Sequence, residues 1–212
     1  MKKNIHAIML LLRKEIGVTT PAVLHATPFK TLIATILSAR TKDTTTFPAS
    51  LRLFKKFPTP EKLSRASPRE IEKLIFPVGF YKTKAKHIIQ ASKLLLSKFN
   101  GKVPKTLEEL TSLPGVGKKT AGCVLVYAFR IPDIPVDVHV AVISQRLGLT
   151  KEKEADKIRL DLMKKVPKPY WLELNELMVK HGQRVCITRK PKCEICHLQK
   201  ICDYYIRKTS KT

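Results

Sequence analysis

The chain has 212 residues, 43% of them hydrophobic, and carries 41 Lys and Arg against 17 Asp and Glu, for a net charge of +24. This composition excludes a mostly disordered chain, and no uninterrupted apolar run is long enough to cross a bilayer. The N-terminus lacks the pattern of a secretory signal, so we expect a cytoplasmic protein. The positive charge is spread along the chain and predicts a polyanionic partner, most commonly nucleic acid. A ribosomal protein or a protein that binds a membrane surface would also fit.

Helix-start signals recur through the first half of the chain. A Thr or Ser followed directly by Pro offers an N-cap residue and a proline at the first helical position, and such pairs begin at Thr20, Thr27, Thr59 and Ser67. Between these positions the apolar residues fall at helical spacing, and no stretch sustains the two-residue alternation of a strand. We therefore expect a nearly all-helical protein.

Residues 106–130 predict a short helix, a glycine hairpin and a second helix. The hairpin lies in the sequence Leu-Pro-Gly-Val-Gly-Lys-Lys-Thr at residues 113–120. Gly115 and Gly117 permit a tight turn and the close approach of another molecule. The helix that follows is expected over 118–130. Its first N–H groups have no partners within the helix, so they can bind an anion.

Lys119 lies in the first turn of that helix, where two roles are open to it. The positive end of the helix dipole and the neighbouring Lys118 both disfavour the charged ammonium. A neutral amine can attack an electrophilic carbon, such as a sugar C1′, and form a Schiff base. Alternatively, both lysines simply bind phosphate. The position of Lys119 alone does not decide between these roles.

Asp137 follows the second helix, which Pro132 and Pro135 should end. Aspartate is among the preferred N-cap residues, so its default role is to cap a helix expected over 138–147. A short proline-containing turn separates it from the helix of Lys119, and a cleft shared with Lys119 is the alternative. For His139 we expect a position on the helix surface.

Further helices are expected over 153–165 and 170–181, and four closely spaced cysteines follow them. Cys186, Cys193, Cys196 and Cys202 give the spacing C-x6-C-x2-C-x5-C. Four cysteines bind either a tetrahedral zinc ion or a [4Fe–4S] cluster. Zinc sites usually pair two Cys-x-x-Cys knuckles, whereas this chain has one, so the spacing favours the cluster. Cys123 lies among apolar helix residues, and we expect it to be an ordinary buried cysteine.

The loop between the first two of these cysteines is basic, with Arg189, Lys190 and Lys192. Cations near a thiolate-ligated cluster stabilise its negative charge. The sharper alternative is that the loop contacts the phosphates of a nucleic acid. The two roles are compatible.

Together these motifs resemble the helix-hairpin-helix DNA glycosylase superfamily and, within it, the endonuclease III family. The resemblance covers nearly the whole chain. It rests on the hairpin sequence at 113–121, on Val-Asp-Val-His at 136–139, on the cysteine spacing, and on Leu-Ser-Ala at 37–39 followed by Thr-Lys-Asp at 41–43.

The resemblance implies an all-α fold of two lobes with a DNA cleft between them. A six-helix lobe with the hairpin would span residues 20–130, and residues 1–19 with 131–212 would form the lobe that holds a [4Fe–4S] cluster. The implied enzyme is a monomeric base-excision-repair DNA glycosylase and AP lyase of the cytoplasm, associated with the nucleoid. It would flip an oxidised pyrimidine out of duplex DNA.

The resemblance also implies roles for particular residues. Lys119 would attack C1′ and displace the base, Asp137 would stabilise positive charge on the sugar and aid proton transfer, and β-elimination would nick the strand 3′ to the lesion. A monovalent cation would bind the carbonyls of Thr111, Leu113 and Val116. The implied DNA contacts of the hairpin and the basic loop are Gly115, Val116, Gly117, Lys118, Thr120, Arg189, Lys190 and Lys192.

Two residues depart from the family pattern. Arg40 stands where the family usually has a glutamine that fills the gap left by the flipped nucleotide, so Arg40 would pair with or stack on the orphan base. Phe80 stands at the position of a wedge leucine, where its ring either intercalates or packs against its own lobe.

Two alternative functions remain: the same fold acting on uracil or thymine in mismatches or on alkylated purines, and a non-catalytic DNA-binding module.

Overall fold

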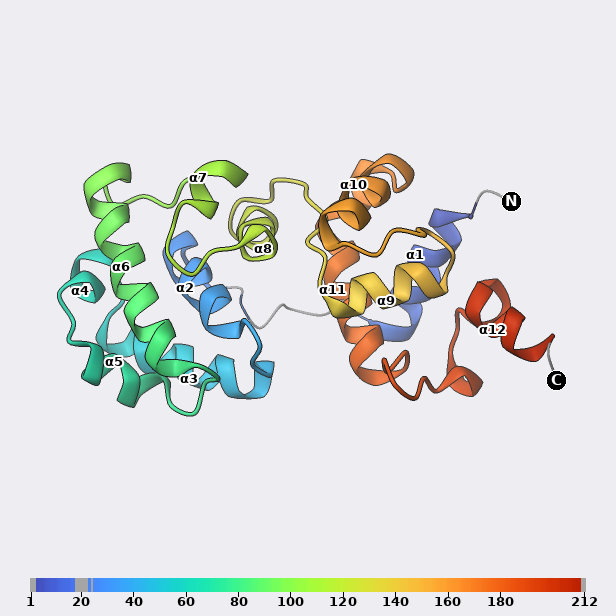
Figure 1. Cartoon of the computed structure of the whole chain (residues 1–212), viewed down its shortest axis with the longest axis horizontal. Helices are drawn as coiled ribbons and strands as arrows, with labels where there is room; N and C mark the ends of the chain where they lie inside the picture. Colours follow the sequence, from blue (N-terminus) through green and yellow to red (C-terminus); the bar gives the residue numbers. More distant parts are fainter. Residues whose placement is uncertain (1–2, 18–22, 24, 211–212) are drawn as a thin grey trace. The chain divides into compact units, whose positions relative to one another are not determined.

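The computed structural model describes residues 3–17, 23 and 25–210, and these residues form helices and turns with no strand among them (Figure 1). The predicted all-helical class is confirmed. The chain divides into two compact units, one of residues 20–131 and one of residues 1–19 with 132–212. Within the described ranges, no helix is both long and apolar enough to cross a membrane. The N-cap predicted at Thr20 lies outside the described residues.

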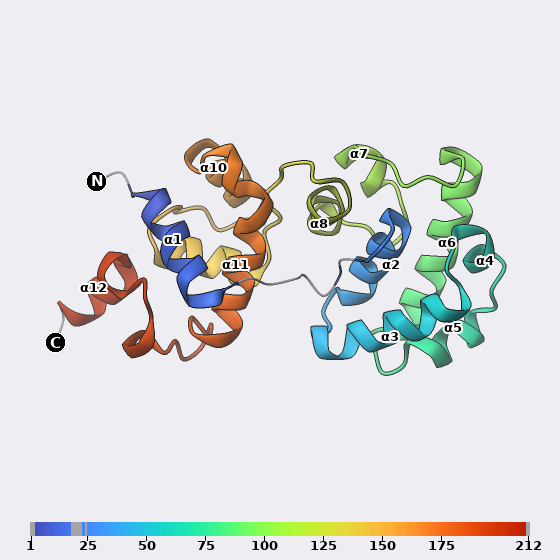
Figure 2. The same cartoon turned by 180° about the vertical axis from the view of Figure 1, so that it is seen from behind.

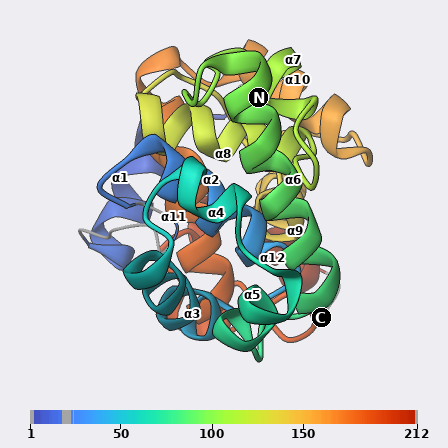
Figure 3. The same cartoon turned by 90° about the vertical axis from the view of Figure 1, so that its left-hand side faces the viewer.

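The unit of residues 20–131 is built around one buried helix. Its helices are α2 (Pro28–Ser38), α3 (Asp43–Lys56), α4 (Pro60–Ser64), α5 (Pro68–Ile75), α6 (Tyr81–Phe99), α7 (Leu107–Thr111) and α8 (Lys118–Phe129). Almost every residue of α2 is buried, and α2 packs against α8 and α3. The long helix α6 packs against α4 and α5 (Figures 1 and 3). These contacts give the unit a continuous apolar core.

Side-chain caps fix the starts of several of these helices. Thr27, Thr59 and Ser67 accept hydrogen bonds from the backbone N–H three residues further on, at 3.3, 3.4 and 3.3 Å. Each satisfies one N–H group that the helix itself leaves without a partner. The three predicted helix starts are therefore confirmed.

The second unit joins the N-terminal helix to the C-terminal part of the chain. It contains α1 (Ile5–Ile16), α9 (Val138–Arg146), α10 (Ala155–Lys165), α11 (Trp171–Arg184) and α12 (Asp203–Thr209). Helix α1 lies alongside α11 (Figure 2), and its buried residues Ile8, Met9 and Leu12 share one core with Met178 of α11. Residues far apart in sequence therefore stabilise one unit.

Some elements differ from the sequence-based expectations. Helix α8 ends at Phe129, because Arg130 takes a left-handed conformation with φ of 57°. Helix α11 continues three residues beyond His181, to Arg184. Helix α12 was not predicted, and it begins without a side-chain cap, so its sequence lacks the usual start signal. The described part of the 20–131 unit contains seven helices, two of only five residues.

Candidate functional site

The glycine hairpin between α7 and α8 has two glycines with different roles. The turn is closed by Val116 N–H, which donates to the carbonyl of Leu113 at 3.1 Å. Gly115 has φ of +80°, and a Cβ there would lie 2.9 Å from Nδ1 of His87, so backbone conformation and packing both require glycine. Among the described residues, a Cβ on Gly117 would meet no atom within 4 Å. Packing within that part of the chain therefore does not require glycine at 117, which leaves room for an external ligand.

The N-terminus of α8 is arranged to receive an anion. Gly117 is its N-cap residue and has no side chain to cap the first N–H groups, and no acidic residue lies in the first turn of this fully described helix. Lys118 and Lys119 are both exposed in that turn. The first N–H groups of the helix, the positive end of its dipole and two lysine side chains therefore lie close together.

The side chains of two predicted DNA contacts of the hairpin are buried. Val116 and Thr120 are buried, with 6% and 8% of their surface exposed. Val116 belongs to the apolar core of the 20–131 unit. Their side chains therefore stabilise the hairpin, and any DNA contact at these positions would come from the backbone.

Asp137 caps α9, as predicted. Its Oδ1 accepts the backbone N–H of Val140 at 2.9 Å, and its side chain is half-buried. Lys119 and Asp137 belong to different units, so each is described within its own unit. The cap fixes the aspartate at the first turn of α9, which leaves its chemical role to be tested.

The expectation that His139 lies on the helix surface is wrong. Its ring is half-buried, and a Cβ on Gly182 of α11 would lie 2.3 Å from its Nδ1. Among the described residues this Nδ1 is a buried atom without a hydrogen-bond partner. The glycine lets α9 and α11 approach closely, a contact that sequence spacing does not reveal.

Arg40 and Phe80 lie side by side on the 20–131 unit. Both are exposed and both take left-handed backbone conformations, with φ of 54° and 57°. The guanidinium carbon of Arg40 lies 5.9 Å from the centre of the Phe80 ring, within the range of a cation–π contact. Phe80 is 63% exposed, so its ring is not packed into the core of its unit.

Lys84 is a buried residue that the sequence analysis missed. It lies on α6 with 6% of its surface exposed. Its Nζ donates to the carbonyls of Leu37 and Ala39 at 2.7 and 2.5 Å and to Oγ1 of Thr41 at 3.1 Å. Burial lowers the pKa of Lys84 to about 8. The only hint in the sequence is its place one residue before the buried Ala85, on the inner face of the helix.

The four cysteines of the C-terminal segment line one cavity. All five cysteines of the chain lie in the described residues, and none of them forms a disulfide bond. Cys186, Cys193, Cys196 and Cys202 share the cavity with Arg146 and His181. Cys123 is buried in the other unit, as predicted.

Arg146 holds the first cysteine and the start of the loop. Its Nη1 donates to Sγ of Cys186 at 3.2 Å, and its Nη2 donates to the carbonyl of Thr188 at 2.6 Å. Burial raises the pKa of the Cys186 thiol, but hydrogen bonds from His181 and Arg146 lower it. The net result is a pKa below the usual value. The loop residues Arg189, Lys190 and Lys192 are exposed, where a polyanion could contact them.

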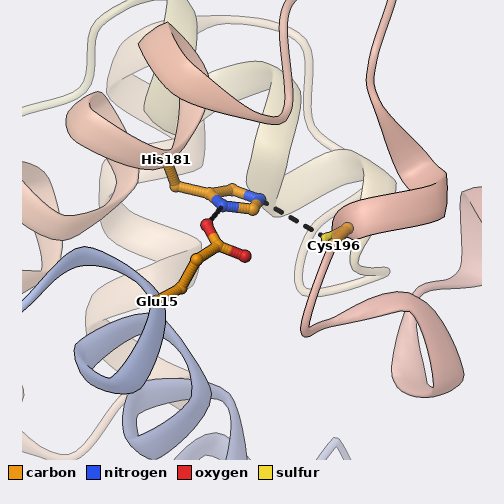
Figure 4. A group of neighbouring side chains, drawn as sticks. All are labelled: Glu15, His181 and Cys196. Atoms are coloured by element: carbon orange, nitrogen blue, oxygen red, sulfur yellow. Dashed lines mark hydrogen bonds and ion pairs between the residues drawn. The ribbon is translucent and has the colours of Figure 1, made fainter.

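A second polar link joins α1 to the cysteine segment (Figure 4). His181, which is 1% exposed, contacts the Glu15 carboxylate through Nδ1, and its Nε2 lies 3.9 Å from Sγ of Cys196. Glu15 also accepts the backbone N–H of His197 at 3.2 Å. Burial by itself lowers the pKa of His181. Hydrogen bonds to Cys186, Cys196 and Glu15 outweigh this effect and raise the pKa to about 11.

Glu15, His181 and Cys196 bring three possible metal-ligand atoms within 4.8 Å of one another. His181 also lines the cavity of the four cysteines. Its two nitrogens are engaged by a carboxylate and by cysteine sulfur. The His181 ring therefore links a carboxylate of α1 to a sulfur of the cysteine segment.

The fold and the hairpin define a helical protein with a helix-hairpin-helix motif. A family model described as "HhH-GPD superfamily base excision DNA repair protein" matches residues 33–168. Endonuclease III of Thermotoga maritima is 42% identical over 181 residues, which cover 85% of each chain. Endonuclease III of Synechocystis sp. is 41% identical over 202 residues, which cover 95% of this chain and 92% of the relative.

The comparison with solved structures agrees. A structure of a trapped covalent intermediate between endonuclease III and DNA superposes with a TM-score of 0.91 at 33% identity, covering 99% of both chains. The chain therefore belongs to the HhH-GPD superfamily of base excision DNA repair proteins and, within it, to the endonuclease III family.

Proposed function

We propose that Lys119 is the nucleophile and Asp137 the charge-stabilising carboxylate of an enzyme that releases oxidised pyrimidines from duplex DNA. As a member of the endonuclease III family, the chain is a base-excision-repair DNA glycosylase with AP lyase activity. The observation that carries the residue roles is the exposed amine of Lys119 at the uncapped N-terminus of α8, beside Lys118.

The proposed chemistry begins with the attack of the Lys119 amine on a sugar carbon. The Lys119 nitrogen bonds to C1′ and loses a proton, while the C1′–N bond breaks and the base leaves with its electron pair and takes up a proton. The product is a closed-ring aminal; its nitrogen electron pair forms the C=N bond as the C1′–O4′ bond breaks and O4′ takes up a proton, which gives the protonated Schiff base. This Schiff base loses a proton from the neighbouring C2′, and the 3′ C–O bond breaks by β-elimination as the phosphate leaves with its electron pair. Positive charge develops on the sugar during the first step, and the Asp137 carboxylate stabilises it and assists the proton transfers.

The hairpin binds the DNA backbone. The first N–H groups of α8 and the open space at Gly117 suit a phosphate, and Lys118 adds a cation. The exposed Arg189, Lys190 and Lys192 form a second phosphate-binding surface. We propose double-stranded DNA as the substrate, a monomeric enzyme acting on the nucleoid in the cytoplasm, and a monovalent cation at the hairpin carbonyls.

Arg40 and Phe80 act on the base pair of the lesion. An exposed ring beside an exposed guanidinium can enter the stack from one side, with Phe80 as the wedge and Arg40 against the orphan base. The left-handed turns project both side chains from the surface. This pair is the source of lesion selectivity in our proposal.

The cysteine cavity fits a [4Fe–4S] cluster held by Cys186, Cys193, Cys196 and Cys202. Its four sulfurs surround one space, and burial together with the other three cysteines raises the pKa of the Cys193 thiol, so a bound cation centre would be needed to hold all four as thiolates. When bound, the cluster supplies a covalent cross-link of the segment. A zinc ion is the alternative that a colourless protein with stoichiometric zinc would establish.

A panel of lesion duplexes with borohydride present tests substrate and chemistry together. We expect an oxidised pyrimidine to be released fastest and a covalent protein–DNA adduct to be trapped. Faster release of mismatched uracil or thymine, or of alkylated purines, would change the substrate. Salt-dependent binding without cleavage or adduct would identify a non-catalytic module instead.

A further inference from the structure

Two turns of the 20–131 unit that are far apart in sequence share one buried ammonium. One turn follows α2 and carries Arg40, and the other precedes α6 and carries Phe80. Lys84 lies on α6 beneath both. Its three N–H bonds reach the carbonyls of Leu37 and Ala39 and the hydroxyl of Thr41. An ammonium has three donors, so every one of them is used.

The hydroxyl of Thr41 extends this network to the second turn. It donates to the carbonyl of Ala39 at 3.3 Å and accepts from Lys84 and from the backbone N–H of Gly79, each at 3.1 Å. A hydroxyl has one donor and two acceptor sites, so its capacity is also filled. A Cβ on Gly79 would lie 3.1 Å from the carbonyl oxygen of Arg40, so the two turns are in close contact.

The network lies directly beneath the two exposed side chains. Gly79 precedes Phe80, and Ala39 and Thr41 flank Arg40 on either side. Arg40 and Phe80 both hold left-handed conformations that non-glycine residues seldom adopt. Such conformations persist where the surrounding contacts determine them, and they concentrate at functional sites. Here the surrounding contacts are those of Lys84 and Thr41.

The burial of a charge at this point is not explained by packing alone. A leucine or methionine on the inner face of α6 would fill similar space without the cost of desolvating an ammonium. The carbonyls of Leu37 and Ala39 lie at the C-terminal end of α2, where the helix dipole favours a cation. The ammonium thus binds two carbonyls at the C-terminal end of α2.

We propose that Lys84 is a positioning residue that holds the Arg40 and Phe80 turns as one unit, so that both side chains enter the DNA together. This inference rests on the proposed function, in which Arg40 and Phe80 act on the base pair of the lesion. Lys84 itself is buried and touches neither DNA nor the reacting atoms.

The test compares Lys84→Met with Lys93→Met, a change of an exposed lysine on the same helix that removes the same charge. The first readout is the fluorescence of 2-aminopurine placed opposite the lesion, which increases when the base is unstacked. The second is base release from duplex DNA under single turnover. The third is cleavage of a single-stranded abasic oligonucleotide, which requires the amine of Lys119 but no insertion into a duplex.

For Lys84→Met we expect a reduced 2-aminopurine signal and base release slower by about tenfold or more, since misplaced groups cost rates of this order. Cleavage of the single-stranded abasic oligonucleotide should stay near the wild-type rate. Lys93→Met should behave as wild type in all three assays. A Lys84→Met enzyme with wild-type 2-aminopurine signal and base release would overturn the proposal.

A second pair of variants keeps the test informative if Lys84→Met does not fold. Thr41→Val removes the bridging hydroxyl and Thr41→Ser retains it. We expect the valine variant to show the same defects in smaller measure and the serine variant to approach wild type; equal behaviour of the two would contradict the network.

If Arg40→Ala and Phe80→Ala lower the 2-aminopurine signal but neither the Lys84 nor the Thr41 change does, the inference fails while the proposed function stands. If wild-type enzyme gives no signal, the proposed role of Arg40 and Phe80 fails together with this inference, while base release and adduct trapping still test Lys119.

Discussion

The unit of residues 20–131 and the cysteine segment of residues 186–202 are stabilised in different ways. In the unit of residues 20–131, α2 and α8 belong to a continuous apolar core, and the exposed residues proposed to act on DNA lie at its surface. In the other unit, the fully described stretch of residues 186–202 forms only two short 3₁₀ turns, and Leu198 is its one buried apolar residue. That stretch is instead held by polar contacts from Arg146, His181 and Glu15.

The difference shows how each kind of site is positioned. A turn on a packed core keeps its shape without a ligand, whereas a segment with little apolar burial needs cross-links to offset its conformational entropy. We therefore expect changes in the hairpin unit to alter activity with a folded protein, and changes around the cysteines to alter the structure of that unit first.

The largest effect should come from Lys119→Ala. Removal of the nucleophile should slow strand cleavage by about a thousandfold or more and abolish the borohydride-trapped adduct. Because the side chain is exposed, thermal unfolding should remain near wild type. Lys118→Ala is the matched control: it should weaken DNA binding and keep the adduct. Undiminished trapping in Lys119→Ala would contradict the assignment of Lys119 as the nucleophile.

Asp137→Asn should have the next largest effect. Asparagine is as good an N-cap as aspartate, so helix α9 should retain its stability. Loss of the carboxylate charge should slow base release by about a hundredfold or more, while DNA binding persists. Base-release rates and duplex affinity, measured side by side, separate the two roles. A fully active Asn variant would leave Asp137 as a helix cap alone.

Cys196→Ser should affect the structure of one unit and spare the other. Loss of one ligand should reduce iron content and visible absorption, and hydrogen exchange should accelerate in residues 186–202 because metal binding contributes to folding there. Exchange in α2 should be unchanged. Cys123→Ala, a change of the buried cysteine in the other unit, should retain full iron content. Equal loss of protection in both units would contradict the contrast between them.

The two hairpin glycines provide the smallest and sharpest comparison. Gly115→Ala should destabilise the protein by about 1–3 kcal/mol, because φ at this position is positive and the added Cβ would clash with the ring of His87. Gly117→Ala should leave thermal stability close to wild type, since its Cβ meets no protein atom. It should nevertheless weaken duplex binding, measured by fluorescence anisotropy, because the methyl group occupies the space proposed for a phosphate. Unchanged binding would remove Gly117 from the interface.

Much of the fold could be predicted from local signals. The Thr and Ser caps lie next to the helices that they begin, and the Asp137 cap depends only on its neighbours, so sequence spacing was sufficient for all of them. The four cysteines line one cavity, and their closeness in sequence made that grouping predictable.

The missed features depend on contacts between distant segments. The close approach of His139 to Gly182 and the ammonium of Lys84 under two turns require α9 with α11 and α2 with α6 to be packed first. The link from Glu15 to His181 spans almost the whole chain. The residues next to these side chains in sequence do not indicate which partners the side chains contact. Helix α12 was missed because it starts without a capping side chain.

The most direct test of the central claim is to locate the cross-link in the borohydride-trapped complex. Wild-type enzyme would be trapped on a duplex with an oxidised pyrimidine, digested, and analysed by mass spectrometry. We predict that the deoxyribose remnant is attached to the Nζ of Lys119. Attachment to Lys118 or to any other amine, or the absence of an adduct while the base is still released, would contradict the account.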